Sequence, residues 1–148
     1  MDCKPEQGSE LTVETMNCPQ GNFVLHRFPL RQKETMRAWD AADEYVLEDI
    51  LEKEISAEGA LIINDGFGAL NVALDTHRPI HIGDSEMARL AHAHNADQNG
   101  QVYDMSRHRG GLESWPQAAD LVIVKIPKSL ALLQHQLYQL RDVLQPET

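Results

Sequence analysis

The sequence predicts an α/β fold in which a mostly parallel sheet carries helices on both faces. From residue 60 onward, short apolar runs alternate with segments of helical periodicity, in the order strand, helix, strand, helix, strand, loop, strand, helix. The runs are partly β-branched and lack apolar–polar alternation, which is typical of strands buried on both faces. Strands that alternate with helices imply right-handed crossovers and a parallel sheet. Residues 21–148 are expected to form this domain.

Length and composition fit one globular domain with a core of its own. The chain has 148 residues, of which 42% are apolar and 24% are charged. No run approaches the roughly 20 apolar residues of a membrane span, and the polar N-terminus lacks the apolar region of a signal peptide. Cys3 and Cys18 have neither metal-site nor redox spacing. We therefore expect a cytoplasmic chain with no membrane partner.

The net charge of −10 is concentrated in one segment. Residues 40–58 carry eight acidic residues against Lys53 alone, whereas residues 101–148 contain five acids and five bases. We interpret the acidic segment as the solvated face of one helix. A chain with this balance does not look like a self-sufficient RNA-binding domain.

The part before residue 60 is expected to contain a flexible start, one strand and one helix. Residues 1–20 are polar and are predicted to be irregular and mobile. Residues 23–28 predict a short strand that Pro29 ends. Residues 38–53 predict a helix, because their apolar positions recur at helical spacing with acids between them.

The elements after residue 60 follow from the same periodicities. Strands are predicted at residues 60–63, 79–82 and 121–126, with a further one beginning at Val102 and Tyr103. Helices are predicted at residues 66–74, 84–95 and 129–144, and a loop at residues 106–118. The chain stops where another strand is expected, so the sheet is predicted to be truncated relative to its usual complement.

The turn after the first parallel strand contains Gly66 and Gly68. In a dinucleotide or S-adenosylmethionine site, an acid and three glycines at this turn let the backbone approach the ligand at a helix N-terminus. Here Asn64 replaces the acid and Leu70 replaces the third glycine. Two glycines in such a turn are also common for steric reasons. The two glycines are therefore interpreted either as vestigial cofactor positions or as purely structural ones.

Asp84 and Ser85 follow the second parallel strand. An acid about 20 residues after the glycine turn is where a ribose hydroxyl of a cofactor would be held. Alternatively, Asp84 or Ser85 caps the next helix by accepting hydrogen bonds from its first-turn amides. The two interpretations are compatible, and both stay open at this point.

The last predicted strand ends in Lys125, Ile126, Pro127 and Lys128. Methyltransferases that act on exocyclic amino groups carry Asn-Pro-Pro and an aromatic residue at the equivalent strand end. There the Asn accepts a hydrogen bond from the target amine and the ring stacks on the flipped base. Only Pro127 matches this pattern, and a lysine cannot accept that hydrogen bond. No catalytic residue is predicted here.

Four bases are candidates for contact with RNA. Lys125 and Lys128 lie at a strand end, and Arg107 and Arg109 lie in the preceding loop. They are expected to form a small phosphate-contacting patch, unless they are merely scattered surface bases. No metal site is predicted, because His92 and His94 are two apart in a helix and point to different faces.

Three segments resemble the N-terminal domain of the ribosomal RNA large subunit methyltransferase G family. They are residues 37–47, 63–70 and 125–133. The run Trp-Asp-Ala-Ala-Asp-Glu-Tyr that begins at Trp39 is specific, and the similarity covers nearly the whole chain after about Gly21. The related small-subunit methyltransferase C has a similar two-domain plan.

The resemblance implies a degenerate Rossmann-like class I methyltransferase fold. It also implies a bacterial, cytoplasmic parent enzyme that transfers a methyl group from S-adenosylmethionine to a guanine N2 of 23S rRNA. In that family two methyltransferase-like domains lie in tandem. The C-terminal one carries the intact glycine motif and Asn-Pro-Pro-Phe, while the N-terminal one has lost both and helps to bind or unfold the RNA.

The expected role is therefore a catalytically silent substrate-binding or scaffold domain that binds no cofactor itself. Its expected partners are the large-subunit rRNA and the catalytic C-terminal domain, which lies outside this sequence. A purely structural packing module is one alternative, and an active methyltransferase with an unusual motif is another.

Overall fold

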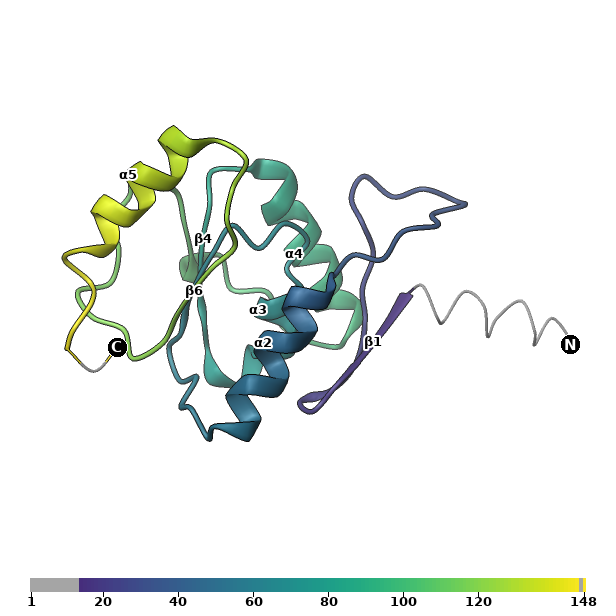
Figure 1. Ribbon diagram of the computed structural model, residues 1–148. Helices are drawn as coiled ribbons and strands as arrows, with labels where there is room; N and C mark the ends of the chain where they lie inside the picture. Colours follow the sequence, from purple (N-terminus) through teal and green to yellow (C-terminus); the bar gives the residue numbers. More distant parts are fainter. Residues whose placement is uncertain (1–13, 147) are drawn as a thin grey trace, which may run out of the picture.

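The computed structural model describes residues 14–146 and residue 148. Its centre is a four-stranded sheet with helices on both faces, and a two-stranded hairpin lies outside one helical layer (Figure 1). No helix in the described part of the chain is long and apolar enough to cross a membrane. The predicted mobility of residues 1–13 falls outside the described residues.

The sheet is parallel throughout, as predicted. Its strands are β3 (Leu61–Ile63), β4 (Ile80–Ile82), β5 (His108–Arg109) and β6 (Val122–Val124), in the spatial order β5-β4-β3-β6. The chain moves from β3 outward to β5 and then returns to place β6 on the other side of β3. This reversal is the arrangement of doubly wound α/β folds, and the predicted fold class is confirmed.

The two faces of the sheet are covered by different helices. The helices are α2 (Ala41–Glu52), α3 (Ala69–Ala73), α4 (Glu86–Gln98) and α5 (Leu130–Leu140), with short 3-10 turns at Asp75–His77 and Met105–Arg107. Ile62 packs with Leu47 of α2 and Leu70 of α3, whereas Ile63 packs with Leu140 of α5. Helix α4 packs beside α3, so α2, α3 and α4 form one layer and α5 covers the opposite face (Figure 1).

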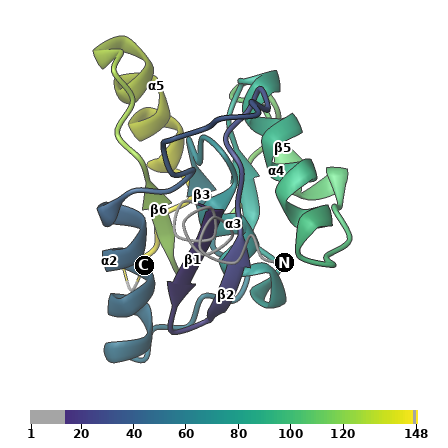
Figure 2. The same cartoon turned by 90° about the vertical axis from the view of Figure 1, so that its right-hand side faces the viewer.

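The hairpin consists of β1 (Thr15–Cys18) and β2 (Gly21–Val24), which pair antiparallel. It lies across α3 between α2 and α4 (Figure 2). Met16 and Leu25 are fully buried in the core cluster of these helices, although the sequence predicts irregular structure for residues 1–20. That expectation is wrong for β1, because a short polar strand becomes stable once its single apolar side chain is covered.

The predicted strand at residues 23–28 is shorter than expected and ends at Val24. Beyond it, the chain pairs with amide side chains of α4 instead of a strand. The Asn99 side chain accepts from the Val24 N–H at 2.8 Å and donates to its carbonyl at 2.7 Å. Asn95 does the same for His26, at 2.8 and 3.0 Å. Side chains one helical turn apart thus replace a strand partner.

The strand predicted to begin at Val102 and Tyr103 is wrong. Val102 is 85% exposed, and the third strand of the sheet is β5, which lies inside the predicted loop of residues 106–118. Asp104 accepts a hydrogen bond from the Ser106 N–H, which turns the chain before it reaches the sheet. β5 then pairs with β4 through His108 opposite His81.

Candidate functional site

The candidate site lies at the carboxyl ends of the parallel strands, next to the reversal between β3 and β6. Ligands of open α/β sheets bind at this place. A hollow of about 410 Å³ opens there, which we call the crevice. Its lining includes Asn64, Gly66, Asp84, Pro127 and Gln136. The fold therefore brings together the glycine turn, the acid after β4 and the end of β6.

The two glycines of the turn differ in what surrounds them. A methyl group at Gly66 would meet no atom within 4 Å, so this residue borders open space. Gly68 has a φ of 81° and begins α3, and a methyl group there would lie 2.7 Å from the Cα of His92. Gly68 is therefore required by the close approach of α3 to α4. Its role in the described chain is one of packing.

The acid that directly precedes Gly66 in the turn is held inside the protein. Asp65 is buried, and its carboxylate accepts hydrogen bonds from the backbone N–H and the side-chain amide of Asn71 at 3.0 and 2.8 Å. It fixes the turn onto the first part of α3. The sequence analysis did not single out this residue, although an Asp beside a glycine turn is a common turn-stabilising residue.

Of Asp84 and Ser85, only Ser85 caps the next helix. Ser85 is the N-cap of α4, and its hydroxyl accepts from the Ala88 N–H at 3.1 Å. The Asp84 carboxylate instead accepts from the Gly111 N–H at 2.7 Å. A methyl group at Gly111 would lie 2.8 Å from the other Asp84 oxygen. Asp84 thus holds the loop after β5 against the end of β4.

Asn64 and Gln136 join β3 to α5 across the reversal point. The Asn64 amide donates to the Lys125 carbonyl at 3.0 Å and to the Gln136 side-chain oxygen at 2.8 Å. Gln136 donates back to Asn64 at 2.9 Å, although it lies on a helix and is only 3% exposed. Asn64, which replaces the motif acid, is therefore held in place by hydrogen bonds to both the nitrogen and the oxygen of its side-chain amide.

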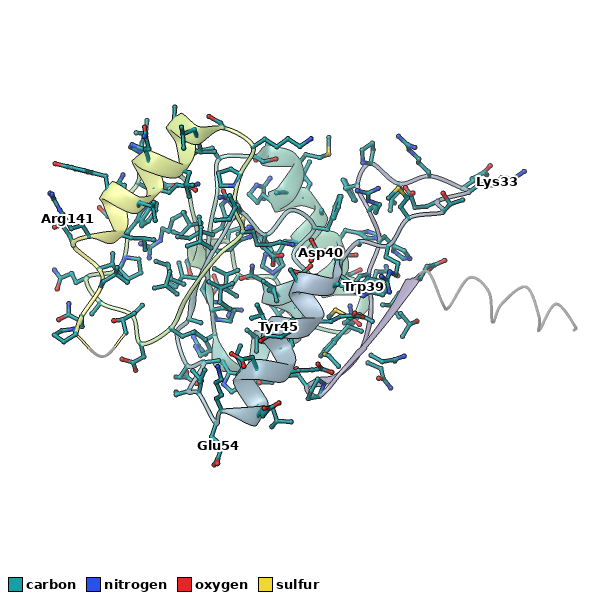
Figure 3. The ribbon with its side chains drawn as sticks, in the orientation of Figure 1. Lys33, Trp39, Asp40, Tyr45, Glu54 and Arg141 are labelled. Atoms are coloured by element: carbon teal, nitrogen blue, oxygen red, sulfur yellow. The ribbon has the colours of Figure 1, made fainter. Side chains whose placement is uncertain are left out.

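Lys125, at the end of β6, points toward α2. Its Nζ lies 2.8 Å from Asp43 and 3.4 Å from Asp40. Asp40 is the N-cap of α2 and lies at the start of that helix in Figure 3. Asp43 is 2% exposed, and burial raises its pKa to about 6, although the Lys125 hydrogen bond opposes this rise. Burial alone would lower the pKa of Lys125, but its hydrogen bond and its proximity to Asp43 raise it. The pair ties β6 to α2.

The structure does not gather the four predicted RNA-contacting bases into one patch. β5 and β6 are opposite edges of the sheet, so Arg107 and Arg109 are separated from Lys125 and Lys128 by two strands. Arg107 pairs with Asp75 at 3.2 Å, and Arg109 donates to the Ser114 carbonyl at 2.7 Å. Lys128 is exposed just before α5.

A histidine cluster that the sequence analysis missed lies beside the crevice. His81 of β4 is buried, its Nδ1 is 3.2 Å from Nδ1 of His92, and its ring centroid is 4.8 Å from that of His108. Burial lowers the pKa of His81 and that of His92 to about 4, so both are neutral at pH 7. His94 contacts His26 instead, which confirms that His92 and His94 face different ways. Within the described residues, no group of three or more His, Cys, Asp or Glu is arranged to hold a metal ion.

The strand order and the reversal beside β3 define a Rossmann-like α/β domain. Residues 13–148 match the family described as RLMG N-terminal domain, and the chain belongs to this family. The family resemblance predicted from the sequence is confirmed.

Three curated relatives carry the name ribosomal RNA large subunit methyltransferase G. The protein of Yersinia enterocolitica is 44% identical over 128 residues, which are 86% of this chain and 32% of the relative. That of Pectobacterium atrosepticum is 40% identical over 141 residues, 95% of this chain and 36% of the relative. That of Klebsiella pneumoniae is 44% identical over 128 residues, 85% of this chain and 33% of the relative. The chain spans about a third of the length of these relatives.

Proposed function

We propose that this domain is the catalytically silent, substrate-binding and scaffolding part of a longer cytoplasmic enzyme. The parent enzyme would methylate large-subunit rRNA, in keeping with the names of the relatives. The family resemblance adds S-adenosylmethionine as the methyl donor and a guanine N2 as the acceptor. The partners of the domain would be that rRNA and the catalytic C-terminal domain.

The contact between Lys125 and Asp43 carries this proposal. Transfer to an exocyclic amine requires a hydrogen-bond acceptor at the end of this strand. Here a cation occupies the position and is directed at a buried carboxylate 2.8 Å away. To turn toward a base, Lys125 would leave Asp43 buried without its partner, which is costly. Lys125 therefore has a structural role within the domain.

The polar groups of the crevice support the absence of a cofactor. A hollow of about 410 Å³ lies in the size range of ligand pockets, so its size alone does not distinguish a functional cofactor site from a vestigial one. Asn64 is engaged by Gln136 and Lys125, and one Asp84 oxygen is engaged by Gly111. Asn64, at the position of the motif acid, and one oxygen of Asp84, at the position that would hold the ribose, are thus used internally.

The RNA-contact role falls on those predicted bases whose charge is not neutralised internally. Lys128 is exposed, and Arg109 donates to backbone carbonyls that carry no net charge. Lys125 and Arg107 each pair with a carboxylate, and we assign them a structural role. Lys128 and Arg109 are therefore the members of the original set to which we assign RNA contact.

A second candidate function is a module that only packs on another domain. The exposed side of α5 favours it, because Leu130, Leu137 and Tyr138 are 67%, 52% and 65% exposed. Lys128→Glu separates the two functions. Loss of RNA affinity in the full-length enzyme supports RNA contact, and unchanged affinity supports packing alone.

Calorimetric titration with S-adenosylmethionine tests the proposal. We expect no binding heat from this chain, with circular dichroism showing it folded, and clear binding by the full-length Yersinia enterocolitica relative as a positive control. A parallel assay offers the chain deproteinised large-subunit rRNA and labelled cofactor. Methyl transfer by this chain alone would overturn the proposal, as would micromolar cofactor binding that Asp84→Asn abolishes.

A further inference from the structure

We propose that residues 26–36 form an RNA-binding site that is separate from the crevice, which we call the loop site. It would take a nucleotide of a single RNA strand, with the base against an apolar wall and the phosphates at a cationic rim. The inference rests on the proposed function, which requires that the domain contacts RNA. It specifies the surface at which that contact is made.

The first observation is a local reversal of charge. Residues 27–37 hold four bases, Arg27, Arg31, Lys33 and Arg37, against the single acid Glu34, in a chain with a net charge of −10. Lys33 lies at the tip of this loop, which projects from the body of the domain (Figure 3). Arg31 and Lys33 are exposed and form no ion pair within the described part of the chain. Exposed cations of this kind attract the phosphate groups of a nucleic acid.

The second observation is a hollow beneath these cations. It has a volume of about 510 Å³, larger than the crevice. Leu25, Leu30 and Met36 give it an apolar wall, and Leu30 and Met36 remain 55% and 59% exposed. The imidazole rings of His26 and His94, with centroids 5.2 Å apart, supply flat surfaces. Flat and apolar walls beneath a cationic rim are what sites for single-stranded nucleic acid combine.

The third observation is that the loop starts from a fixed frame. Asn95 holds the backbone of His26 through two hydrogen bonds, and its amide also donates to the Phe67 carbonyl at 2.8 Å. At the other end, Ala38 and Trp39 are buried in the core. A site whose walls stand on rigid elements loses less entropy on binding than a free loop would.

Arg27 connects the loop site with the crevice. Its guanidinium lies over the Phe67 ring, 5.0 Å from the centroid, and Phe67 also lines the crevice. An RNA strand that extends from the loop site toward the crevice would therefore pass the Arg27 and Phe67 side chains at the border between the two.

Fluorescence anisotropy with a labelled single-stranded RNA oligonucleotide tests the site. The test variant is Arg31→Gln with Lys33→Gln, and the matched control is Lys53→Gln with Arg141→Gln. Arg141 lies on the opposite side of the molecule from Lys33 (Figure 3). We expect the test variant to raise Kd about tenfold at low salt, and the slope of log K against log salt to fall by about 1.4, or roughly 0.7 for each lost phosphate contact. The control should retain the affinity of the unaltered chain.

A second variant addresses the wall of the hollow. Leu30→Ser with Met36→Ser removes two exposed apolar side chains, so the fold is unaffected, and we expect a several-fold rise in Kd with an unchanged salt slope. If the unaltered chain binds no RNA, both this site and the RNA-contact role fail. If it binds RNA but the test variant matches the control, only the loop site is overturned. A loss confined to the loop variants supports it.

Discussion

The crevice and the loop site use their polar residues in opposite ways. In the crevice Asn64 is bonded to Gln136, and at the neighbouring strand end Lys125 faces the buried Asp43, so the side chains at motif positions hold the domain together. In the loop site, Arg31 and Lys33 are exposed and form no ion pair with any of the described residues. The position of a residue in an inherited motif therefore says less about its role than the group that it contacts.

The largest effect is expected at the crevice turn. Gly68→Ala places a methyl group 2.7 Å from the His92 backbone at a φ of 81°. Clash and strain together should lower the free energy of unfolding by about 3 kcal/mol. Gly66→Ala is the matched control, and its loss should stay within about 1 kcal/mol because nothing lies nearby. Urea denaturation measures both. Equal losses would contradict the division of roles between the glycines.

A somewhat smaller loss is expected from Lys125→Met. It leaves Asp43 buried without a cation, and because Lys125 itself is 25% exposed we expect a loss of about 2–3 kcal/mol at pH 7. The added substitution Asp43→Asn should restore most of it. If Lys125→Met is neutral in urea denaturation but weakens RNA binding, the contrast between crevice and loop site is broken.

The same pair predicts a pH dependence. The pKa of Asp43 is raised from 3.8 to about 6 in the folded protein, so the folded state keeps this proton to higher pH than the unfolded state does. Its contribution to stability is therefore greatest below pH 4 and is lost as the pH rises from about 4 to 6. In Lys125→Met the pKa of Asp43 should rise further, so acidification toward pH 6 should recover part of the lost stability. A flat profile would contradict this assignment.

The bond between Asn64 and α5 gives a smaller effect. Gln136→Leu removes the partner of the Asn64 amide and should cost about 1–2 kcal/mol in urea denaturation. Gln134→Leu, at an exposed position of α5, is a control for the helix itself. A larger loss from the control would mean that the reversal point does not depend on Gln136.

The smallest effect is expected in the loop site. Arg31→Gln with Lys33→Gln should change the free energy of unfolding by less than about 0.5 kcal/mol, because both side chains are exposed and neither pairs with a carboxylate in the described part of the chain. The loss should appear only in RNA affinity. A clear drop in stability would make the loop a structural element like the crevice.

Much of the sheet is predictable because three of its four strands have sequences that indicate burial. The runs that contain β3, β4 and β6 are apolar and partly β-branched, and the structure has them in parallel register. The edge strand β5 and the hairpin strand β1 are not predictable in this way. β5 consists of His108 and Arg109, and β1 of four residues with one buried side chain, so neither differs from a loop in composition.

The candidate site was predicted in position but not in its contacts. The glycine turn, Asp84 and the end of β6 do meet at one edge of the sheet. Yet Lys125 and Asp40 are 85 positions apart, and Asn64 and Gln136 are 72 apart, so no local pattern signals these partnerships. The loop site depends on contacts between His26 and Asn95 across 69 positions, although its cluster of bases is visible in the sequence.

Asn99 has an effect that reaches beyond the hairpin it supports. A two-stranded hairpin has outer edges whose free N–H and C=O groups invite a strand from another molecule. At Val24 both outward groups are already taken by the Asn99 amide, which imitates one step of a neighbouring strand. The outer edge of β2 is thereby closed at that point to intermolecular pairing. One asparagine at the end of a helix thus protects this strand edge against aggregation through hydrogen bonds alone. The strand itself needs neither a proline nor a charged residue at that position.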